Sequence, residues 1–199
     1  MTQSSPEPER RKTGEPTYRL ELHTDTYDIR VYQPYLVTEV IVPGPAESAS
    51  RDGFRLLAAF IFGSNGGSHK LAMTAPVTQT PVTLPMTVPV PLSMTVPVTQ
   101  SPEAGGFRVR FVMPAGPTLA TLPVPNDPRV KLCEVPAQRL AVRRYSGRWT
   151  EENYAEQLAE LRASRTAAGL TAHRAPILGR YSAPYVLPFL MRNDVWLLA

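Results

Sequence analysis

The order of predicted elements repeats once along the chain. In each half, two strands are followed by a helix and then by two more strands. We predict strands where apolar and polar residues alternate, and helices where apolar residues recur every three to four positions. Two such halves are typical of a pseudo-twofold α+β domain, in which one curved antiparallel sheet of about eight strands supports two helices. The predicted strands are 27–33, 35–42, 69–74, 107–113, 129–135, 140–145, 177–181 and 194–198, and the predicted helices are 50–62 and 150–168.

A proline-rich stretch interrupts the first half. The phrase MTAPVTQ at Met73 is nearly repeated as MTVPVTQ at Met94, and MTVPV begins at Met86. Proline has no N–H to donate to a sheet, so a continuous central strand is excluded here. The Thr and Val residues between the prolines favour extended backbone. We therefore expect one strand to end near Val77, an extended excursion over about residues 78–102, and a second strand piece from near Met94.

Composition narrows the class of protein. The sequence contains no apolar run of the ~18 residues that a membrane span needs. Residues 1–16 are polar and proline-bearing, which predicts a disordered tail rather than a signal peptide, and residues 17–199 are expected to form one domain. A cytoplasmic location is therefore expected, with the lone Cys133 reduced. The net charge of +4 is mild and the cations are scattered, so nucleic acid is not an expected partner.

The first predicted helix is apolar on two sides. One stripe consists of Phe54, Leu57, Ala58 and Ile61, and the other of Leu56, Ala59, Phe60 and Gly63. A large apolar side chain left in water forfeits roughly 1.5–3 kcal/mol, so one stripe must meet the sheet and the other must meet something else. Three alternatives stay open: other parts of the chain, an apolar ligand, or a second subunit. Arg51 and Arg55 either lie in water or hold the carboxylates of such a ligand.

Six phrases occur in a recognisable order. They are YDIRVYQPYLVTEV, KLAMTAPVTQ, FRVRFVMP, LPVPNDPRVKLCEVP, AVRRYSG and YSAPYVLPFLMRNDVWLL. Together they closely resemble the SOUL family, also called the haem-binding protein family, over about Tyr18 to Leu198. The resemblance implies a distorted antiparallel β-barrel with two helices. It also implies non-covalent binding of haem or other porphyrins in an apolar pocket beside the first helix. The family is similar in fold to small-molecule-sensing domains of the GyrI type, so a sensing or partner-binding module with incidental haem affinity is the alternative.

The resemblance also implies where a tetrapyrrole would bind. Transferred by position, the site comprises Arg51, Phe54, Arg55, Leu57, Ala58 and Ile61, with Tyr185 and Leu187 closing it. Some members have methionine at the positions of Phe54 and Ala58 and a basic residue near Val186, and others have histidine at the position of Val31. This chain lacks all of these, which leaves the iron ligand open.

The remaining metal-ligand candidates are few. His69, just after the SNGG loop, is the candidate iron ligand, whereas His23 and His173 are predicted to be surface residues. The sequence has no His/Cys/carboxylate cluster at metal spacing, no GxSxG motif and no glycine-rich phosphate loop. No catalytic residue is therefore predicted, and the protein is not expected to be an enzyme. Whether it is a monomer or a dimer stays open.

Overall fold

The computed structural model describes residues 15–72, 75–83, 105–170, 175–182 and 186–199. The elements in chain order are β1 (Tyr18–His23), β2 (Asp28–Tyr32), β3 (Tyr35–Pro43), α1 (Ala46–Ile61), β4 (Val77–Thr83), β5 (Gly105–Val112), β6 (Lys131–Val135), β7 (Gln138–Ser146), α2 (Glu151–Ala167), β8 (Ile177–Arg180), the 3-10 turn η1 (Pro188–Leu190) and β9 (Arg192–Leu198).

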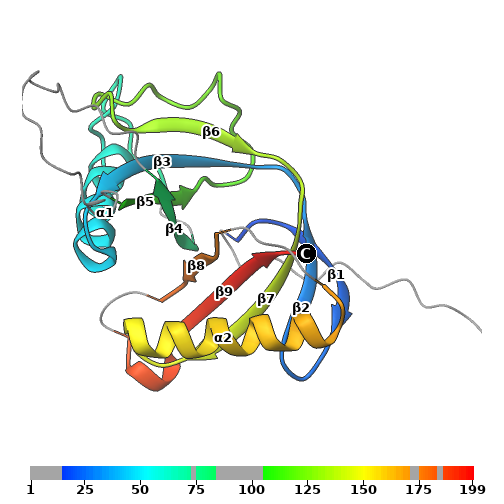
Figure 1. The fold of residues 1–199 in the computed structure, drawn as a ribbon. Coiled ribbons are helices and arrows are strands. Elements are labelled where there is room, and N and C mark those ends of the chain that lie inside the picture. Colours follow the sequence, from blue (N-terminus) through cyan, green and yellow to red (C-terminus); the bar gives the residue numbers. More distant parts are fainter. Residues whose placement is uncertain (1–14, 73–74, 84–104, 171–174, 183–185) are drawn as a thin grey trace, which may run out of the picture.

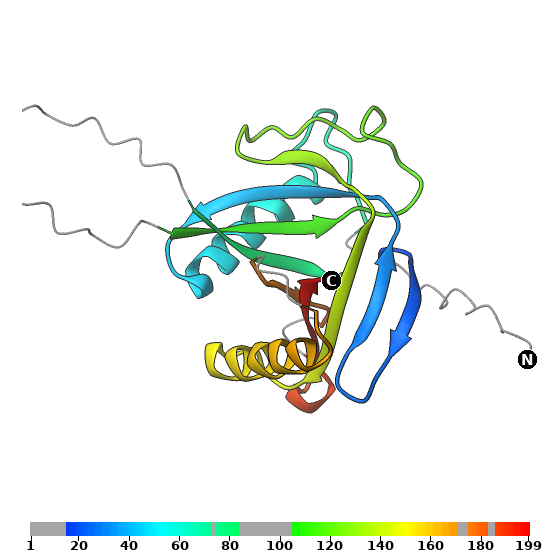
Figure 2. The same ribbon diagram turned by 45° about the vertical axis from the view of Figure 1, so that its right-hand side comes forward.

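All nine of these strands join one antiparallel sheet, in the order β1-β2-β7-β9-β8-β4-β5-β3-β6. The sheet is strongly curled, with β3, β5 and β6 turned away from β2, β7 and β9 (Figures 1 and 2). Helix α1 packs on β3 and β5, and α2 packs on β7 and β9. The predicted α+β class, with a distorted barrel-like sheet and two helices, is therefore confirmed. In the described part of the chain, neither helix is long and apolar enough to cross a bilayer.

The predicted repeat is visible in the strand pairing. In the first half β3 pairs with β5 and β5 with β4, and in the second half β7 pairs with β9 and β9 with β8. The halves meet where β4 pairs with β8, and the middle pair of that ladder is Thr78 with Gly179. The first strand of each half also pairs with a strand of the other half, since β2 pairs with β7 and β6 pairs with β3. Edge strand β1 stands outside the repeat and was not predicted.

Both helices cover the same face of the sheet. Residues directly opposite each other in an antiparallel ladder point to one face. One such row runs across five strands through Phe111, Val77, Arg180, Asn193 and Tyr145. Phe111 belongs to the apolar core beneath α1, and Tyr145 belongs to the core beneath α2. Arg180 therefore lies on the helix-covered face, midway between the two cores.

The two helix starts differ, and one was predicted wrongly. Helix α2 begins as predicted, since the Thr150 side chain accepts a hydrogen bond from the Asn153 N–H. Helix α1 begins at Ala46, one turn earlier than the predicted cap at Ser50, and has no side-chain cap. Its N-cap residue is Pro45, whose φ of −63° and ψ of 156° place it in extended backbone directly before the first turn.

Strand β4 corrects the prediction for the proline-rich stretch. Residues 69–72 are not a strand, and β4 begins at Val77, where a strand was expected to end. Residues 78–83 belong to this strand and not to an excursion. Pro81 is tolerated because β8 pairs with β4 only as far as Gln79, so Pro81 has a strand on one side alone. The predicted strand piece at Met94 and residues 84–102 of the excursion lie outside the described residues, as does most of the predicted tail.

Candidate ligand cavity beside helix α1

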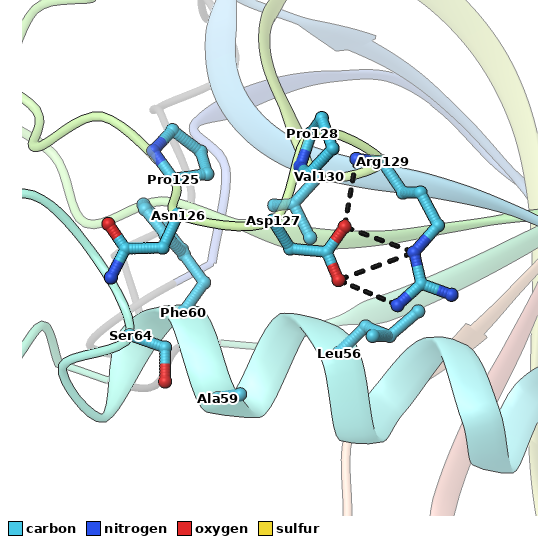
Figure 3. A pocket seen from close by; sticks show the side chains of 10 residues that line it. All are labelled: Leu56, Ala59, Phe60, Ser64, Pro125, Asn126, Asp127, Pro128, Arg129 and Val130. Carbon is cyan, nitrogen blue, oxygen red and sulfur yellow. Dashed lines mark hydrogen bonds and ion pairs between the residues drawn. The ribbon is translucent and has the colours of Figure 1, made fainter.

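A cavity of about 590 Å³ lies between the C-terminal half of α1 and the loop that precedes β6. Figure 3 shows the helix forming its floor and the loop its roof. Small-molecule sites typically measure ~300–1,000 Å³ and are mainly apolar with a few polar groups. This cavity meets both criteria. Its lining consists of Leu56, Ala59, Phe60 and Ser64 from the helix side and Pro125, Asn126, Asp127, Pro128, Arg129 and Val130 from the loop.

Asn65 holds the end of the cavity floor in place. This residue is 2% exposed, and its side-chain amide donates to the carbonyl oxygens of Phe60 and His69, both at 2.8 Å. Its Oδ1 accepts the N–H of His69 at 2.9 Å. A single buried amide thus satisfies backbone groups at the end of α1 and in the following loop, which fixes that loop against the helix.

The roof is tied to the same loop. The Gly66 N–H donates to the Val124 carbonyl at 2.8 Å, and the Asn126 N–H donates to the Ser64 carbonyl at 3.2 Å. Asn65 and Pro125 form an isolated β-bridge between these bonds. Because backbone hydrogen bonds join floor and roof, the two walls of the cavity are held in a fixed position relative to each other.

One ion pair stands at the polar side of the cavity. The Nε and Nη2 atoms of Arg129 lie 3.0 and 2.6 Å from the two carboxylate oxygens of Asp127, and the backbone N–H of Arg129 also donates to Asp127. These hydrogen bonds lower the pKa of Asp127 to about 2 and raise that of Arg129. The pair projects from the roof toward Leu56 (Figure 3). An acidic ligand would have to compete with Asp127 for this guanidinium.

The cavity is bordered by one apolar stripe of α1, and the transferred site residues lie on the other. Leu57 and Ile61 are 0% and 1% exposed and belong to the core against the sheet, with Ala58 packed beside them. Phe54 meets the ring of Phe111 edge-on, at 5.2 Å between centroids. The transferred site and this cavity thus share helix α1, but the cavity is lined by Leu56, Ala59 and Phe60.

Arg51, Arg55 and Leu187 are not among the residues that line this cavity. Arg51 and Arg55 have side chains 65% and 76% exposed, at 3.8 and 3.9 Å from Glu47 and Asp52. Leu187 is exposed on the segment before β9. Tyr185 lies outside the described residues.

His69 is not among the ten lining residues. It is exposed, and its ring lies against Gly67, where an added Cβ would come within 2.6 Å of the imidazole Nε2. Among the described residues, the lining offers no histidine, cysteine, methionine or tyrosine to an iron atom. Within the described ranges there is also no group of three or more His, Cys, Asp and Glu residues that could hold a metal. None of the lining side chains that the structure describes is therefore a customary axial ligand of iron.

Part of this site was not identified from sequence. The stretch from Pro125 to Val130 falls inside the phrase LPVPNDPRVKLCEVP, which carried the resemblance but no predicted pocket role. Asn65 was taken only as part of a helix-ending loop. Both segments have a composition that indicates a structured turn, namely an Asn beside glycines and a Pro-Asn-Asp-Pro run.

Fold and cavity define the protein as an α+β domain, with a curled antiparallel sheet and a ligand-sized hollow beside its first helix. A family model described as SOUL heme-binding protein matches residues 13–198. Because that match spans nearly the whole sequence, the chain belongs to the SOUL haem-binding family. A search of curated proteins finds no match.

Several solved structures share the fold. The C-terminal domain of EcmrR superposes with a TM-score of 0.58 at 10% identity, covering 91% of this chain and 96% of that one. A structure described as a hydrolase from Listeria innocua gives a TM-score of 0.54 at 13% identity, covering 89% and 93%. An uncharacterised conserved protein from Listeria innocua gives 0.54 at 12% identity, covering 86% and 90%. At such identities the likeness shows the fold alone.

Proposed function

We propose that this protein binds haem or a related tetrapyrrole non-covalently in the cavity beside α1 and acts as a cytoplasmic carrier or buffer. The observation that carries the proposal is a 590 Å³ hollow, with an apolar helix stripe as its floor, in a member of the SOUL family. Nothing in the cavity lining resembles a catalytic constellation, so we expect binding without turnover.

The chemistry of the lining supports a flat apolar ligand. Leu56 and Ala59 present hydrocarbon from the helix and Pro128 presents it from the roof, while Phe60 and Val130 lie behind them as buried core residues. Burying apolar surface stabilises a complex by about 25 cal/mol per Å². A ring inserted between floor and roof would bury both of its faces, while its carboxylates would stay near Arg129 at the polar side.

The lining also predicts that iron contributes little to binding. We expect iron-free protoporphyrin IX to bind within about threefold of haemin, a difference under 1 kcal/mol. His69→Ala should leave the ferric and ferrous spectra unchanged. A shifted spectrum in that variant would instead assign His69 as an axial ligand, as predicted from the sequence.

The test fills the cavity. Ala59→Trp places an indole on the cavity floor, and Ala159→Trp places the same side chain on the exposed face of α2. Titration of each protein with haemin, followed by the Soret band, should show at least tenfold weaker binding for Ala59→Trp and wild-type binding for Ala159→Trp, since ~1.4 kcal/mol corresponds to tenfold. Equal affinities in the two variants would exclude this cavity.

The second candidate is a small-molecule-sensing module with incidental haem affinity, which the resemblance in fold to GyrI-type domains suggested from the sequence. The two candidates differ in which ligand stabilises the protein most. A ligand that binds only the native state stabilises it by RT ln(1 + [L]/Kd), so at equal concentration the tighter ligand raises the melting temperature further. If a different apolar ligand raises it further than haemin at equal concentration, the sensing module is favoured.

A further inference from the structure

Arginines in this structure have a recurrent way of binding carboxylates. Four of them donate from both Nε and Nη2, the side-on edge of the guanidinium, to a single acidic side chain. This edge places two parallel N–H groups in the geometry that a carboxylate accepts. The four pairs are Arg30 with Asp28, Arg129 with Asp127, Arg139 with Glu21 and Arg192 with Asp194.

Arg180 presents the same edge without a carboxylate. Its Nε and Nη2 atoms are both buried, and neither has a hydrogen-bond partner among the described residues. None of the ion pairs between described residues includes Arg180, and Glu47, an acid that influences its pKa, has a side chain that is 78% exposed. Burial without a partner lowers the pKa of Arg180. The Arg180 side chain as a whole is only partly buried, but two desolvated N–H donors without partners are costly unless a ligand accepts from them.

The position of this guanidinium is fixed from one side. Its Cζ lies 4.1 Å from the ring centroid of Trp149, the residue directly before the N-cap Thr150 of α2. Stacking uses the flat face of the guanidinium and leaves its donor edge available. Arg180 therefore has a defined orientation but an unfilled hydrogen-bonding edge.

The nearby unpartnered groups are mostly donors. The Tyr145 hydroxyl and the Trp149 indole Nε1 are both buried without a partner. Burial raises the pKa of Tyr145 to about 12, so the phenol keeps its proton and can donate. Gln79 supplies the one acceptor, Oε1, while its amide nitrogen donates to the Ala46 carbonyl at the start of α1. These residues carry one positive charge and several unpartnered donors. A ligand that complements them would be a monoanion with two acceptor oxygens.

We infer that Arg180 binds the carboxylate of a small organic acid, held between the N-terminal ends of α1 and α2 on the helix-covered face of the sheet. The site is separate from the cavity beside α1. Glu47 and Ala59 are twelve residues apart along the helix, or about 18 Å at 1.5 Å per residue. The inference does not rest on tetrapyrrole binding.

Side-chain NMR tests this assignment with sodium benzoate as the probe. The Nε–H resonance of Arg180 should shift in a saturable way on addition of benzoate up to about 10 mM, and should not shift with benzamide, its neutral analogue. Arg180→Lys should weaken the binding at least tenfold, because it keeps the charge but loses the two-pronged edge, worth ~1.5 kcal/mol or more. Arg180→Gln should abolish it, and Arg162→Gln on the exposed face of α2 should not change it.

Three outcomes would overturn the assignment. They are no saturable shift with benzoate, unchanged benzoate binding in Arg180→Gln, and an equal response to inorganic phosphate, which would indicate a general anion site. A stability measurement gives an independent answer. Without ligand, Arg180→Met should melt no lower than wild type, since it removes an unpaired buried charge, and benzoate should raise only the wild-type melting temperature. A clearly lower melting temperature in Arg180→Met would mean that Arg180 supports the apo structure and is not a ligand residue.

Discussion

The two halves of the molecule share one order of elements but use their helices differently. A glycine with positive φ precedes both helices, Gly44 before α1 and Gly147 before α2. Helix α2 then has a side-chain cap and one apolar stripe against the sheet, whereas α1 has no such cap and is apolar on two sides. Only α1 therefore has apolar surface left after packing on the sheet, and the 590 Å³ cavity lies on that surface.

Strands β4 and β8, which pair where the two halves meet, differ in how their side chains contact the helices. Gln79 on β4 reaches the first residue of α1, where its amide nitrogen bonds the Ala46 carbonyl. Arg180 on β8 reaches the start of α2, where it stacks on Trp149. The first contact is a neutral hydrogen bond and the second leaves donors of a buried cation without partners. The unpartnered donors of Arg180 therefore lower the free energy of unfolding of the second half, as ligand sites commonly do.

The largest expected effect concerns the ion pairs on the sheet face opposite the helices. In the second half, the fully buried Asp194 lies 3.0 Å from Arg192, 3.5 Å from Arg30 and 3.6 Å from Arg144. Asp194→Asn should lower the free energy of unfolding by about 3 kcal/mol, because it removes a fully buried carboxylate that three guanidinium groups share, although Arg30 keeps Asp28 and Arg192 keeps Glu15. Urea denaturation measures this directly.

The matched change in the first half is Glu39→Gln. Glu39 pairs with Arg110 at 2.8 Å, but both side chains are partly exposed. We expect a loss of only about 1 kcal/mol there. If the two variants were equally destabilised, the second half would not depend more on its ion pairs than the first.

The next effect concerns how closely α1 approaches the sheet. A Cβ added at Gly53 would lie 2.6 Å from a Val109 methyl on β5. Gly53→Ala should therefore destabilise the protein by about 1–3 kcal/mol through overpacking. Val109→Ala in the same chain should recover part of that loss, and a double-mutant cycle would show it as a favourable coupling. Additive losses would indicate that the helix shifts without strain.

A smaller effect distinguishes the helix starts. Thr150→Ala should cost ~1 kcal/mol, because the Asn153 N–H loses its acceptor at the start of α2. Ser50→Ala should change stability by less than about 0.5 kcal/mol, because Ser50 lies inside α1 and caps nothing. Thermal unfolding of both variants makes the comparison, and a larger loss at Ser50 would contradict the helix start at Ala46.

The smallest effect concerns the exposed ion pair of the cavity. Because the folded pKa of Asp127 is about 2, below its ordinary 3.8, the pair contributes fully above pH 3.8 and its contribution disappears as the pH falls toward 2. Arg129→Gln should return the Asp127 pKa toward 3.8. Carboxyl carbon NMR during an acid titration measures both values, and a wild-type pKa of 3.8 or above would show that the pair does not form.

Sequence periodicity predicted most of the fold because each central strand buries one face and alternates accordingly. Strand β1 was not predicted, although Tyr18, Leu20 and Leu22 alternate with polar residues. An exposed edge strand buries little apolar surface, so its alternation is a weaker signal than that of the central strands. The start of α1 was misplaced because Ser50 is a good cap in isolation, whereas the helix begins at Ala46 after Pro45, without a side-chain cap that would mark its start in the sequence.

The candidate site was predictable only to the level of the helix. Two apolar stripes were recognisable from the spacing, but which stripe meets the sheet depends on Gly53, where the helix approaches β5 closely. That contact turns Leu57 and Ile61 inward and leaves Leu56 and Ala59 toward the loop. The roof could not be predicted, because Asn65 and Val124 are far apart in sequence and meet through backbone hydrogen bonds that carry no sequence pattern.

The most direct test of the central claim is to map protoporphyrin IX binding on the isotope-labelled protein by NMR. Ring-current shifts fall off steeply with distance, so they report which side chains touch the macrocycle. The cavity predicts the largest shifts at Leu56, Ala59, Phe60 and Val130, on the floor and roof. Shifts centred instead on Phe54 and Leu187, or no saturable shifts at all, would contradict binding in this cavity.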